Sequence, residues 1–396
     1  MLIKNATVVE PDRLVEGQAV LCRGAKIVRV GPELEPDAAG EDVFDAAGGL
    51  LAPGYIDLHT HGGHKFLIDH GADELAGLCG VLPRYGVTGL LAGVCPRPRG
   101  EDTAFLAELA KVRSEGSQLF GLHLEGPFLT LTGALPPDSV GADGADRVHE
   151  LIRACAPYRA VFSISPDLPG IAALIPEMTQ GGGPVFITHT AADVRQTQAA
   201  IEAGARHATH FYDVFPCPPV RDPGVRPCGA VEAVLADPRA SVDFILDGEH
   251  VDPVAVKMAL ACKGPDRVCL ITDANVGAGL PPGRHEFVGG AEVEFKYEGG
   301  PARLTERSRY PGGLAGSGLT MDRAVRNAVS MLGIGIPLAV RMASLNPAKV
   351  LGLDDVKGRV RAGYDADLVL LDSSLRVVRT WVGGQCRFSA KEGGTR

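Results

Sequence analysis

Six residues that could bind a metal ion and move a proton stand at the ends of short apolar runs. They are His59, His61, Glu125, His189, His210 and Asp273. Imidazole and carboxylate groups are the usual ligands of zinc and related divalent ions. Such ions acidify a bound water, which then attacks an amide or related bond with a carboxylate acting as general base. The residue types therefore indicate metal-dependent hydrolysis.

The spacing of these residues leaves room for one or two ions. Residues two apart in a strand point to the same face, so both imidazoles of His59-Thr60-His61 would enter the same space. With two ions, this pair would hold one, His189 and His210 the other, and Glu125 would bridge them. Each residue alone has an ordinary structural explanation, such as a core histidine or a helix N-cap. Their shared position favours a site.

The six residues are expected to share one rim, because the apolar runs that they end are predicted to be parallel strands of one barrel. Eight runs alternate with helical stretches, which predicts an α/β fold with a closed (β/α)8 TIM-like barrel. The runs are Tyr55–His61, Val87–Val94, Leu119–Glu125, Ala160–Ser165, Val185–Thr190, Ala208–Tyr212, Val242–Asp247 and Val268–Asp273. In such barrels catalytic groups lie at the carboxyl ends of the strands, and Asp247 also ends one.

The hydrophobic pattern at both ends of the chain differs from that of the middle. Short alternating runs with turn residues fill the first and last ~50 residues, which predicts a small β-sandwich built from both termini. The expected division is 1–51 and 346–396 for this sandwich and 52–345 for the metal-dependent barrel. A hairpin is expected over Glu286–Leu304, inserted on the barrel.

The composition excludes several classes of protein. The 396 residues carry a net charge of −9, which gives no general reason to bind nucleic acid or anionic lipid. No run approaches the ~18 apolar residues of a membrane span, and no leader is evident at the N-terminus. Nine cysteines without a C-x-x-C pair predict reduced thiols and a cytoplasmic location.

Eight segments carry a resemblance to the N-acetylglucosamine-6-phosphate deacetylase family of the amidohydrolase superfamily. They are Pro53–Gly62, His123–Phe128, Thr188-His189, Thr209–Tyr212, Arg221–Gly224, Asp247–His250, Thr272–Ala274 and Leu314–Met321. The PG-x-ID-x-H-x-H run marks only the superfamily, whereas HLEGPF resembles this family specifically. The match extends nearly end to end.

The resemblance implies removal of the acetyl group from an N-acetylated amino sugar, with N-acetylglucosamine-6-phosphate as the simplest substrate. It implies Glu125, His189 and His210 as metal ligands, the first histidine pair for a second ion, and Asp273 as general acid and base. Zinc is the first candidate metal, and iron, manganese or cobalt would also fit. The implied substrate contacts are Asp213, Val214, Arg221, His250, Ala315, Gly316 and Ser317. Arg221 would reach across a homodimer interface.

Two departures from the family pattern bear on the choice of substrate. Leu135 stands where the family has a substrate-binding histidine, and Asp213 replaces an asparagine that binds phosphate. A carboxylate ~4 Å from a phosphate costs about 1 kcal/mol per charge pair in water and about 4 at an effective dielectric of 20. The same chemistry on a different, possibly non-phosphorylated, N-acyl sugar or amide therefore stays open.

Two other classes receive less support from the sequence. A barrel that binds a metabolite without converting it would not need Asp273 above the metal ligands. Serine or cysteine nucleophile chemistry is not favoured, because no G-x-S-x-G elbow is present and no cysteine stands beside a histidine motif.

Overall fold

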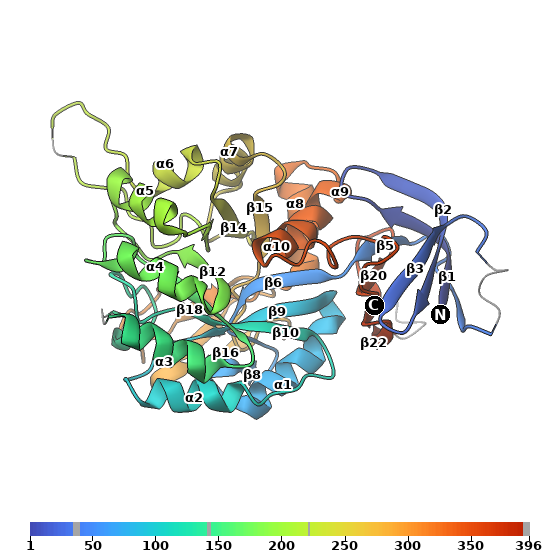
Figure 1. The fold of residues 1–396 in the computed structure, drawn as a ribbon, viewed down its shortest axis with the longest axis horizontal. Coiled ribbons are helices and arrows are strands. Elements are labelled where there is room, and N and C mark those ends of the chain that lie inside the picture. The colour runs from blue at the N-terminus through green and yellow to red at the C-terminus, as the bar shows by residue number, and fades with distance from the viewer. Residues whose placement is uncertain (35–39, 141–143, 221, 391–396) are drawn as a thin grey trace.

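Eight parallel strands form the centre of the molecule. The computed structural model describes residues 1–34, 40–140, 144–220 and 222–390. The strands follow the sheet order β15-β14-β13-β12-β11-β10-β9-β6 (Figure 1). They are β6 Tyr55–Thr60, β9 Val87–Val94, β10 Gln118–Leu124, β11 Arg159–Ile164, β12 Gly182–Ile187, β13 His207–Ala208, β14 Ser241–Ile245 and β15 Val268–Ile271. All of β9 is buried and mostly apolar, as expected of a parallel strand covered on both faces.

Hydrogen bonds join the first strand to the eighth at their carboxyl ends. The Asp273 N–H donates to the carbonyl of His59 at 2.9 Å. The buried Asp57 carboxylate in β6 accepts from the Thr272 N–H at 3.2 Å and from its hydroxyl at 2.6 Å. Burial nevertheless raises the pKa of Asp57 to about 7. These bonds close the barrel at the rim that carries the candidate residues, and the predicted fold class is confirmed.

Helices alternate with the strands, and successive helices pack against one another around the barrel. They are α1 Ala72–Val81, α2 Glu101–Leu109, α3 Ala145–Cys155, α4 Ile171–Thr179, α5 Val194–Ala203, α6 Ala230–Ala236, α7 Pro253–Lys263, α8 Met321–Leu332, α9 Ile336–Ala343 and α10 Leu345–Val350. Asp193 and Gln196 form a capping box that fixes the start of α5. Within the described part of the chain, no helix combines the length and apolar character needed to span a membrane.

Both chain ends contribute to one further sheet beside the barrel (Figure 1). Its order is β22-β21-β20-β5-β1-β2-β3, with β4 paired to β1. The strands are β1 Leu2–Val9, β2 Leu14–Arg23, β3 Lys26–Gly31, β4 Val43–Asp45, β5 Leu50–Pro53, β20 Leu368–Leu371, β21 Val377–Val382 and β22 Gln385–Ser389. Buried Lys357 ties this sheet to the barrel, because its ammonium contacts Asp367 at 2.6 Å and Gln118 of β10 at 3.1 Å. The exact domain bounds stay predictions.

A separate antiparallel sheet is inserted between β15 and α8. Its strands are β16 Gly283–Glu286, β17 Glu292–Phe295, β18 Pro301–Leu304 and β19 Leu314–Ser317. The hairpin expected over Glu286–Leu304 was therefore too small, since a fourth strand returns to the barrel. The sheet packs its apolar face on Leu67 and Val276 of the barrel rim.

The fifth and sixth barrel strands end earlier than the sequence predicted. The apolar run Ala208–Tyr212 contains only the end of β13, and His189 lies two residues beyond β12. The reason is backbone conformation, because His189, His210 and Tyr212 have φ angles of 45°, 33° and 80°. Extended strands do not tolerate these left-handed values, so the chain turns where the candidate ligands begin.

Candidate metal centre

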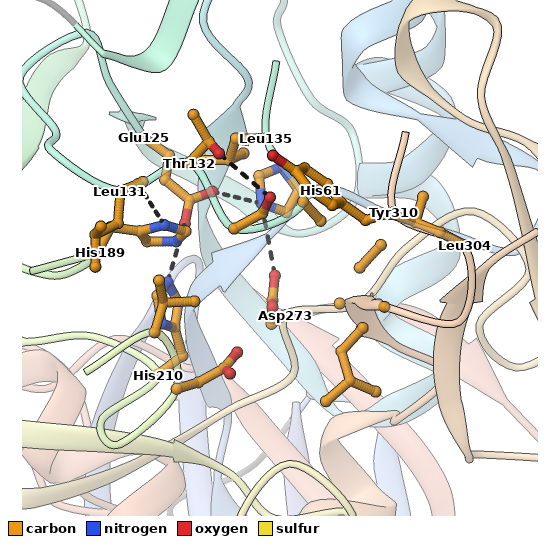
Figure 2. A pocket seen from close by; sticks show the side chains of 18 of the residues that line it. His61, Glu125, Leu131, Thr132, Leu135, His189, His210, Asp273, Leu304 and Tyr310 are labelled. Atoms are coloured by element: carbon orange, nitrogen blue, oxygen red, sulfur yellow. Dashed lines mark hydrogen bonds and ion pairs between the residues drawn. The ribbon is translucent and has the colours of Figure 1, made fainter. Parts of the chain in front are cut away.

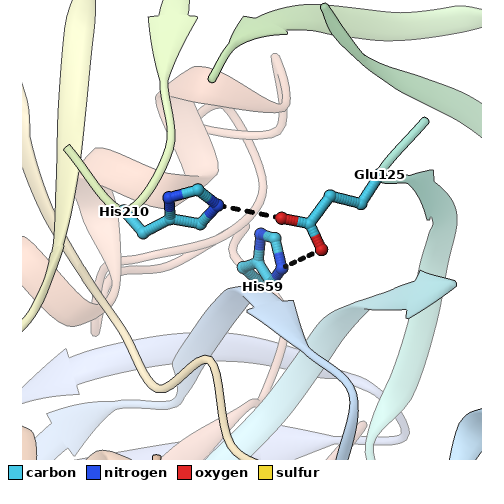
Figure 3. A group of neighbouring side chains, drawn as sticks. All are labelled: His59, Glu125 and His210. Atoms are coloured by element: carbon cyan, nitrogen blue, oxygen red, sulfur yellow. Dashed lines mark hydrogen bonds and ion pairs between the residues drawn. The ribbon is translucent and has the colours of Figure 1, made fainter. Parts of the chain in front are cut away.

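Glu125 lies between two pairs of histidines at the carboxyl end of the barrel. Its Oε2 is 3.5 Å from Nε2 of His59 and 3.1 Å from Nε2 of His61. Its Oε1 is 3.3 Å from Nε2 of His189 and 2.9 Å from Nε2 of His210. Figure 2 shows His61 on one side of the carboxylate with His189 and His210 on the other, and Figure 3 shows His59 beside the same group. All five side chains are buried.

Asp273 completes the group on the side of the first histidine pair. Its Oδ1 lies 3.5 Å from Nε2 of His59 and 3.5 Å from Nε2 of His61. The backbone of Gly316 passes directly over Asp273, and a Cβ at that position would come within 2.6 Å of the Asp273 carbonyl. A glycine with φ +72° is required for this approach. The neighbouring Ser317 N–H donates to the same carbonyl at 2.8 Å, which fixes Asp273 at the rim.

The hydrogen bonds behind the histidines direct their other nitrogens toward Glu125. Nδ1 of His189 lies 3.0 Å from the Leu131 carbonyl, which can only accept, so Nδ1 carries the proton. Nδ1 of His59 lies 3.2 Å from the Thr209 hydroxyl. A neutral imidazole protonated at Nδ1 presents a lone pair at Nε2.

The donor set fits a bound cation. Nε2 of His59 and Nε2 of His61 face each other at 3.0 Å, and both point at a carboxylate. Lone pairs gathered in this way repel one another unless protons or a metal ion lie among them. The trios His59–Glu125–His210 and His59–His61–Asp273 each bring three ligand atoms within 4.8 Å of one another. The donor set therefore fits a divalent cation.

Backbone strain is concentrated at these residues. Asp273 has φ 43°, and His189 and His210 are also left-handed. Such conformations cost roughly 1–3 kcal/mol each and persist only where surrounding contacts hold them. Asp243 of β14 supplies one such contact, since its Oδ1 accepts from the His210 N–H at 2.5 Å. His207 in turn lies 2.7 Å from the other oxygen of Asp243.

Interactions between Glu125 and the histidines lower the pKa of Glu125 and raise the pKa of His210. Burial alone would raise the pKa of Glu125, but the charge of His59 and hydrogen bonds from His189 and His210 hold it well below its ordinary value. Burial lowers the pKa of His210, yet the hydrogen bond and charge of Glu125 outweigh this and raise it to about 9. In the metal-free protein near neutral pH, His210 is therefore protonated and Glu125 ionised.

Metal binding is consequently expected to release the proton of His210, because only neutral imidazole coordinates a metal. Near pH 7 the release from His210 is about one proton, and it falls to about half as the pH reaches the pKa of about 9. Calorimetric titration in buffers of different ionisation enthalpy measures the total proton release, and subtracting the value for His210→Asn gives the share of His210. A share that does not decrease between neutral pH and pH 9 would contradict the assignment.

A cavity of about 760 Å³ opens above the group. Its lining contains five of the residues expected from the sequence to shape the substrate site: Leu135, Asp213, Val214, Ala315 and Gly316. Leu304 and Tyr310 close one side of it (Figure 2). Apart from the histidines, the charged side chains among the described lining residues are carboxylates, and none is a lysine or arginine. Arg221 lies outside the described residues.

Three other candidates, Ser317, Asp247 and His250, do not line the cavity. Ser317 is fully buried and donates its hydroxyl to the Thr272 carbonyl at 2.6 Å. Asp247 does not join the metal ligands, because its carboxylate accepts from the His250 ring at 2.7 Å and from loop N–H groups. The His250 side chain is 2% exposed, and its Nε2 is buried without a partner among the described residues. A buried imidazole nitrogen in this condition is suited to meet a ligand.

Sequence reasoning missed Cys95 and Asp69. Cys95 follows β9 directly and lines the cavity, and its Sγ lies 3.8 Å from Nδ1 of His61. No cysteine stands beside a histidine motif in the sequence, yet Cys95 lies beside His61 in space, because β9 pairs with β6, which carries His59 and leads directly to His61. The rule that found the other residues, inspection of each strand end, would have found Cys95.

Known proteins share this fold and this arrangement of the chain. The Amidohydrolase family pattern matches residues 298–389. The chain is 36% identical to N-acetylgalactosamine-6-phosphate deacetylase of Escherichia coli O157:H7 over 85% of this chain and 87% of the relative. It is 31% identical to N-acetylglucosamine-6-phosphate deacetylase of Lysinibacillus sphaericus over 98% and 97% of the two chains. A mutant Mycobacterium smegmatis N-acetyl-D-glucosamine-6-phosphate deacetylase, solved with N-acetyl-D-glucosamine-6-phosphate, superposes with a TM-score of 0.87 at 30% identity, covering 98% and 99%.

The barrel, the donor set and these similarities define a metal-dependent hydrolase of the amidohydrolase superfamily. Within that superfamily, the chain belongs to the N-acetylglucosamine-6-phosphate deacetylase family. Membership in a family of enzymes leaves the alternative of a non-catalytic binding barrel without support.

Proposed function

We propose that the protein hydrolyses the acetyl group from an N-acetylated amino sugar 6-phosphate, most simply N-acetylglucosamine-6-phosphate, giving glucosamine-6-phosphate and acetate. The observation that carries this proposal is the convergence of four histidines on Glu125, with Asp273 3.5 Å from His59 and from His61. The names of the relatives support an amino-sugar 6-phosphate, and they include both the N-acetylglucosamine and the N-acetylgalactosamine forms.

His59, His61, Glu125, His189 and His210 would hold one or two divalent ions, with zinc the first candidate and iron, manganese or cobalt the others. When bound, such ions polarise the acyl carbonyl and make a coordinated water acidic near neutral pH. The protein fixes these ligands through the hydrogen bonds behind them and through the strained turns that end the strands.

Asp273 performs the proton transfers in this proposal. Its Oδ1 accepts the proton of the attacking water as the new C–O bond forms at the acetyl carbon. The same group then donates that proton to the amide nitrogen as the C–N bond breaks, so acetate and a free amine leave. Leu131, Leu135 and Leu304 surround the reacting groups with apolar surface, which excludes competing water.

The remaining expected residues would bind the sugar. Backbone groups of Ala315 and Gly316 lie in the cavity wall beside Asp273, and Asp213 and Val214 lie in the same lining. His250 offers a buried Nε2 that has no partner within the described part of the chain. The roles of Arg221 and Ser317 in substrate binding stay predictions, as does a cytoplasmic location.

A homodimer would bring Arg221 to the site of the partner. The loop between β13 and α6 stands away from the barrel (Figure 1), and Val220 and Val225 on it are 67% and 58% exposed. These two valines leave apolar surface on the loop that a second copy of the chain could cover. Light scattering on the eluting protein measures the mass that tests this.

A second candidate keeps the chemistry and changes the ligand to an N-acyl sugar without phosphate. Asp213 favours it, since its carboxylate lines the cavity and no lysine or arginine stands among the described lining residues to neutralise it. The discriminating experiment measures acetate release by the metal-loaded protein from N-acetylglucosamine-6-phosphate, N-acetylgalactosamine-6-phosphate and both unphosphorylated sugars. Release from a 6-phosphate alone supports the first candidate, and release from a plain sugar alone supports the second.

Replacing Asp213 with asparagine separates the candidates further. Removal of the carboxylate eliminates a repulsion of about 1–4 kcal/mol against a phosphate, so the KM for a 6-phosphate is expected to fall about fivefold or more. The KM for a plain sugar is expected to stay the same or rise. Steady-state kinetics of both substrates give the two values. An unchanged KM for the 6-phosphate would show that Asp213 does not face it.

A further inference from the structure

Cys95 lies behind one of the candidate metal ligands. It is 3% exposed, and its Sγ is 3.8 Å from Nδ1 of His61. The opposite nitrogen of that ring, Nε2, is the one that faces Glu125 and Asp273. The thiol therefore contacts His61 on the side away from the proposed metal and can act on the metal only through this ring.

Asp69 holds Cys95 in that place. Both carboxylate oxygens of Asp69 accept from the Cys95 N–H, at 3.2 and 3.4 Å. Asp69 is 5% exposed, and its carboxylate, the thiol and the His61 ring bring one atom each within 4.8 Å of one another. Arg97 donates to the Asp69 carbonyl at 2.5 Å and fixes the same turn.

The hydrogen-bonding capacity of His61, Cys95 and Asp69 determines which atom carries each proton. For Nε2 of His61 to bind a metal, Nδ1 must carry the proton and donate it, and Sγ of Cys95 is the acceptor in reach. The thiol proton can in turn be donated to the Asp69 carboxylate, which only accepts when ionised. His189 has a carbonyl oxygen in this position and His59 a hydroxyl. Sulfur is a weaker acceptor than either oxygen, so the hydrogen bond that orients His61 depends on the correct placement of Cys95.

We propose that Cys95 and Asp69 are positioning residues, which hold the ring of His61 with its proton on Nδ1 and thereby set the affinity of the metal ion bound by His59 and His61. This inference rests on the proposed function, because it requires that a metal occupies this half of the site. It assigns no ligand role to Cys95 itself.

The test follows metal loss from the fully loaded protein. Wild type and variants are equilibrated with increasing chelator, and the metal remaining per subunit is measured by mass spectrometry. Cys95→Ala is expected to release one ion at about tenfold lower chelator concentration, within the 10–100-fold typical of such supporting residues. Cys95→Ser keeps a hydroxyl that can accept and donate, so it is expected to remain close to wild type. The ion held by His189 and His210 should not change.

Two further variants distinguish positioning from general stability. Asp69→Asn is expected to match Cys95→Ala, and the double variant to be no weaker than either, because the two residues act in one chain. Cys155→Ala, at a buried cysteine of α3, is the matched control and should leave both ions unaffected. The Tm of the metal-free proteins shows whether folding has changed, and Cys95→Ser stays informative if the alanine variant folds poorly.

The possible results separate this inference from the proposed function. A wild-type protein that binds no metal overturns both. A Cys95→Ala variant that holds both ions as tightly as the wild type overturns only the role of Cys95. Equal weakening of both ions, together with a lower Tm, would also overturn it, because that pattern indicates a structural role alone.

Discussion

Asp273→Asn is expected to lower kcat and kcat/KM together by about a thousandfold, within the 10²–10⁴ range of general acid–base catalysis, while the metal content stays that of the wild type. Asparagine keeps the size of the side chain and one acceptor oxygen but cannot accept a proton at neutral pH. Asp273 lines the cavity and lies 3.5 Å from each of His59 and His61, so a water bound there meets its carboxylate. Acetate release and metal analysis measure the two quantities.

The control for this variant is Asp12→Asn, an exposed aspartate in the turn after β1, which should leave both quantities unchanged. Loss of metal in Asp273→Asn would show that Asp273 acts mainly as a ligand. Retention of more than about a tenth of wild-type kcat would contradict its role in proton transfer, given the size of that contribution.

Most of the candidate centre was predictable because parallel strands share one rim. His59 and Glu125 could be located from the sequence once their runs were interpreted as strands, since strands of one barrel end on the same side. The exact strand ends were less accurate. Strand β13 ends at Ala208, two residues before the candidate ligand His210, whose φ angle is left-handed. The hydrophobic pattern of the sequence carries no information about φ.

The walls of the cavity were not predictable in the same way. Leu304 and Tyr310 reach it because the inserted sheet folds back through β19 and packs on the rim. Asp69 reaches Cys95 through the short β7 Gly62–Gly63 and β8 Phe66–Leu67 that follow β6. Such contacts depend on how loops pack in space, which short-range patterns in the sequence do not encode.

Glu125→Gln is expected to weaken metal binding by at least about 100-fold and to abolish measurable acetate release, because all four histidines lose the carboxylate between them. The substitution removes the negative charge that balances a divalent ion among neutral imidazoles. Glutamine also offers one oxygen instead of two equivalent ones, so it cannot serve both histidine pairs. Metal analysis after dialysis gives the result, with exposed Glu101→Gln as the matched control.

The same substitution changes the metal-free protein in a way that tests the electrostatic argument. Glu125 raises the pKa of His210 to about 9, so its loss lets burial lower that pKa, and His210 becomes neutral near pH 7. The wild-type pair stabilises the fold fully below the unfolded pKa of about 6.5 and progressively less as the pH rises through 9. Metal-free wild type should therefore gain more Tm than Glu125→Gln on going from pH 9 to pH 6. An identical pH dependence in both proteins would mean that Glu125 does not control the protonation of His210.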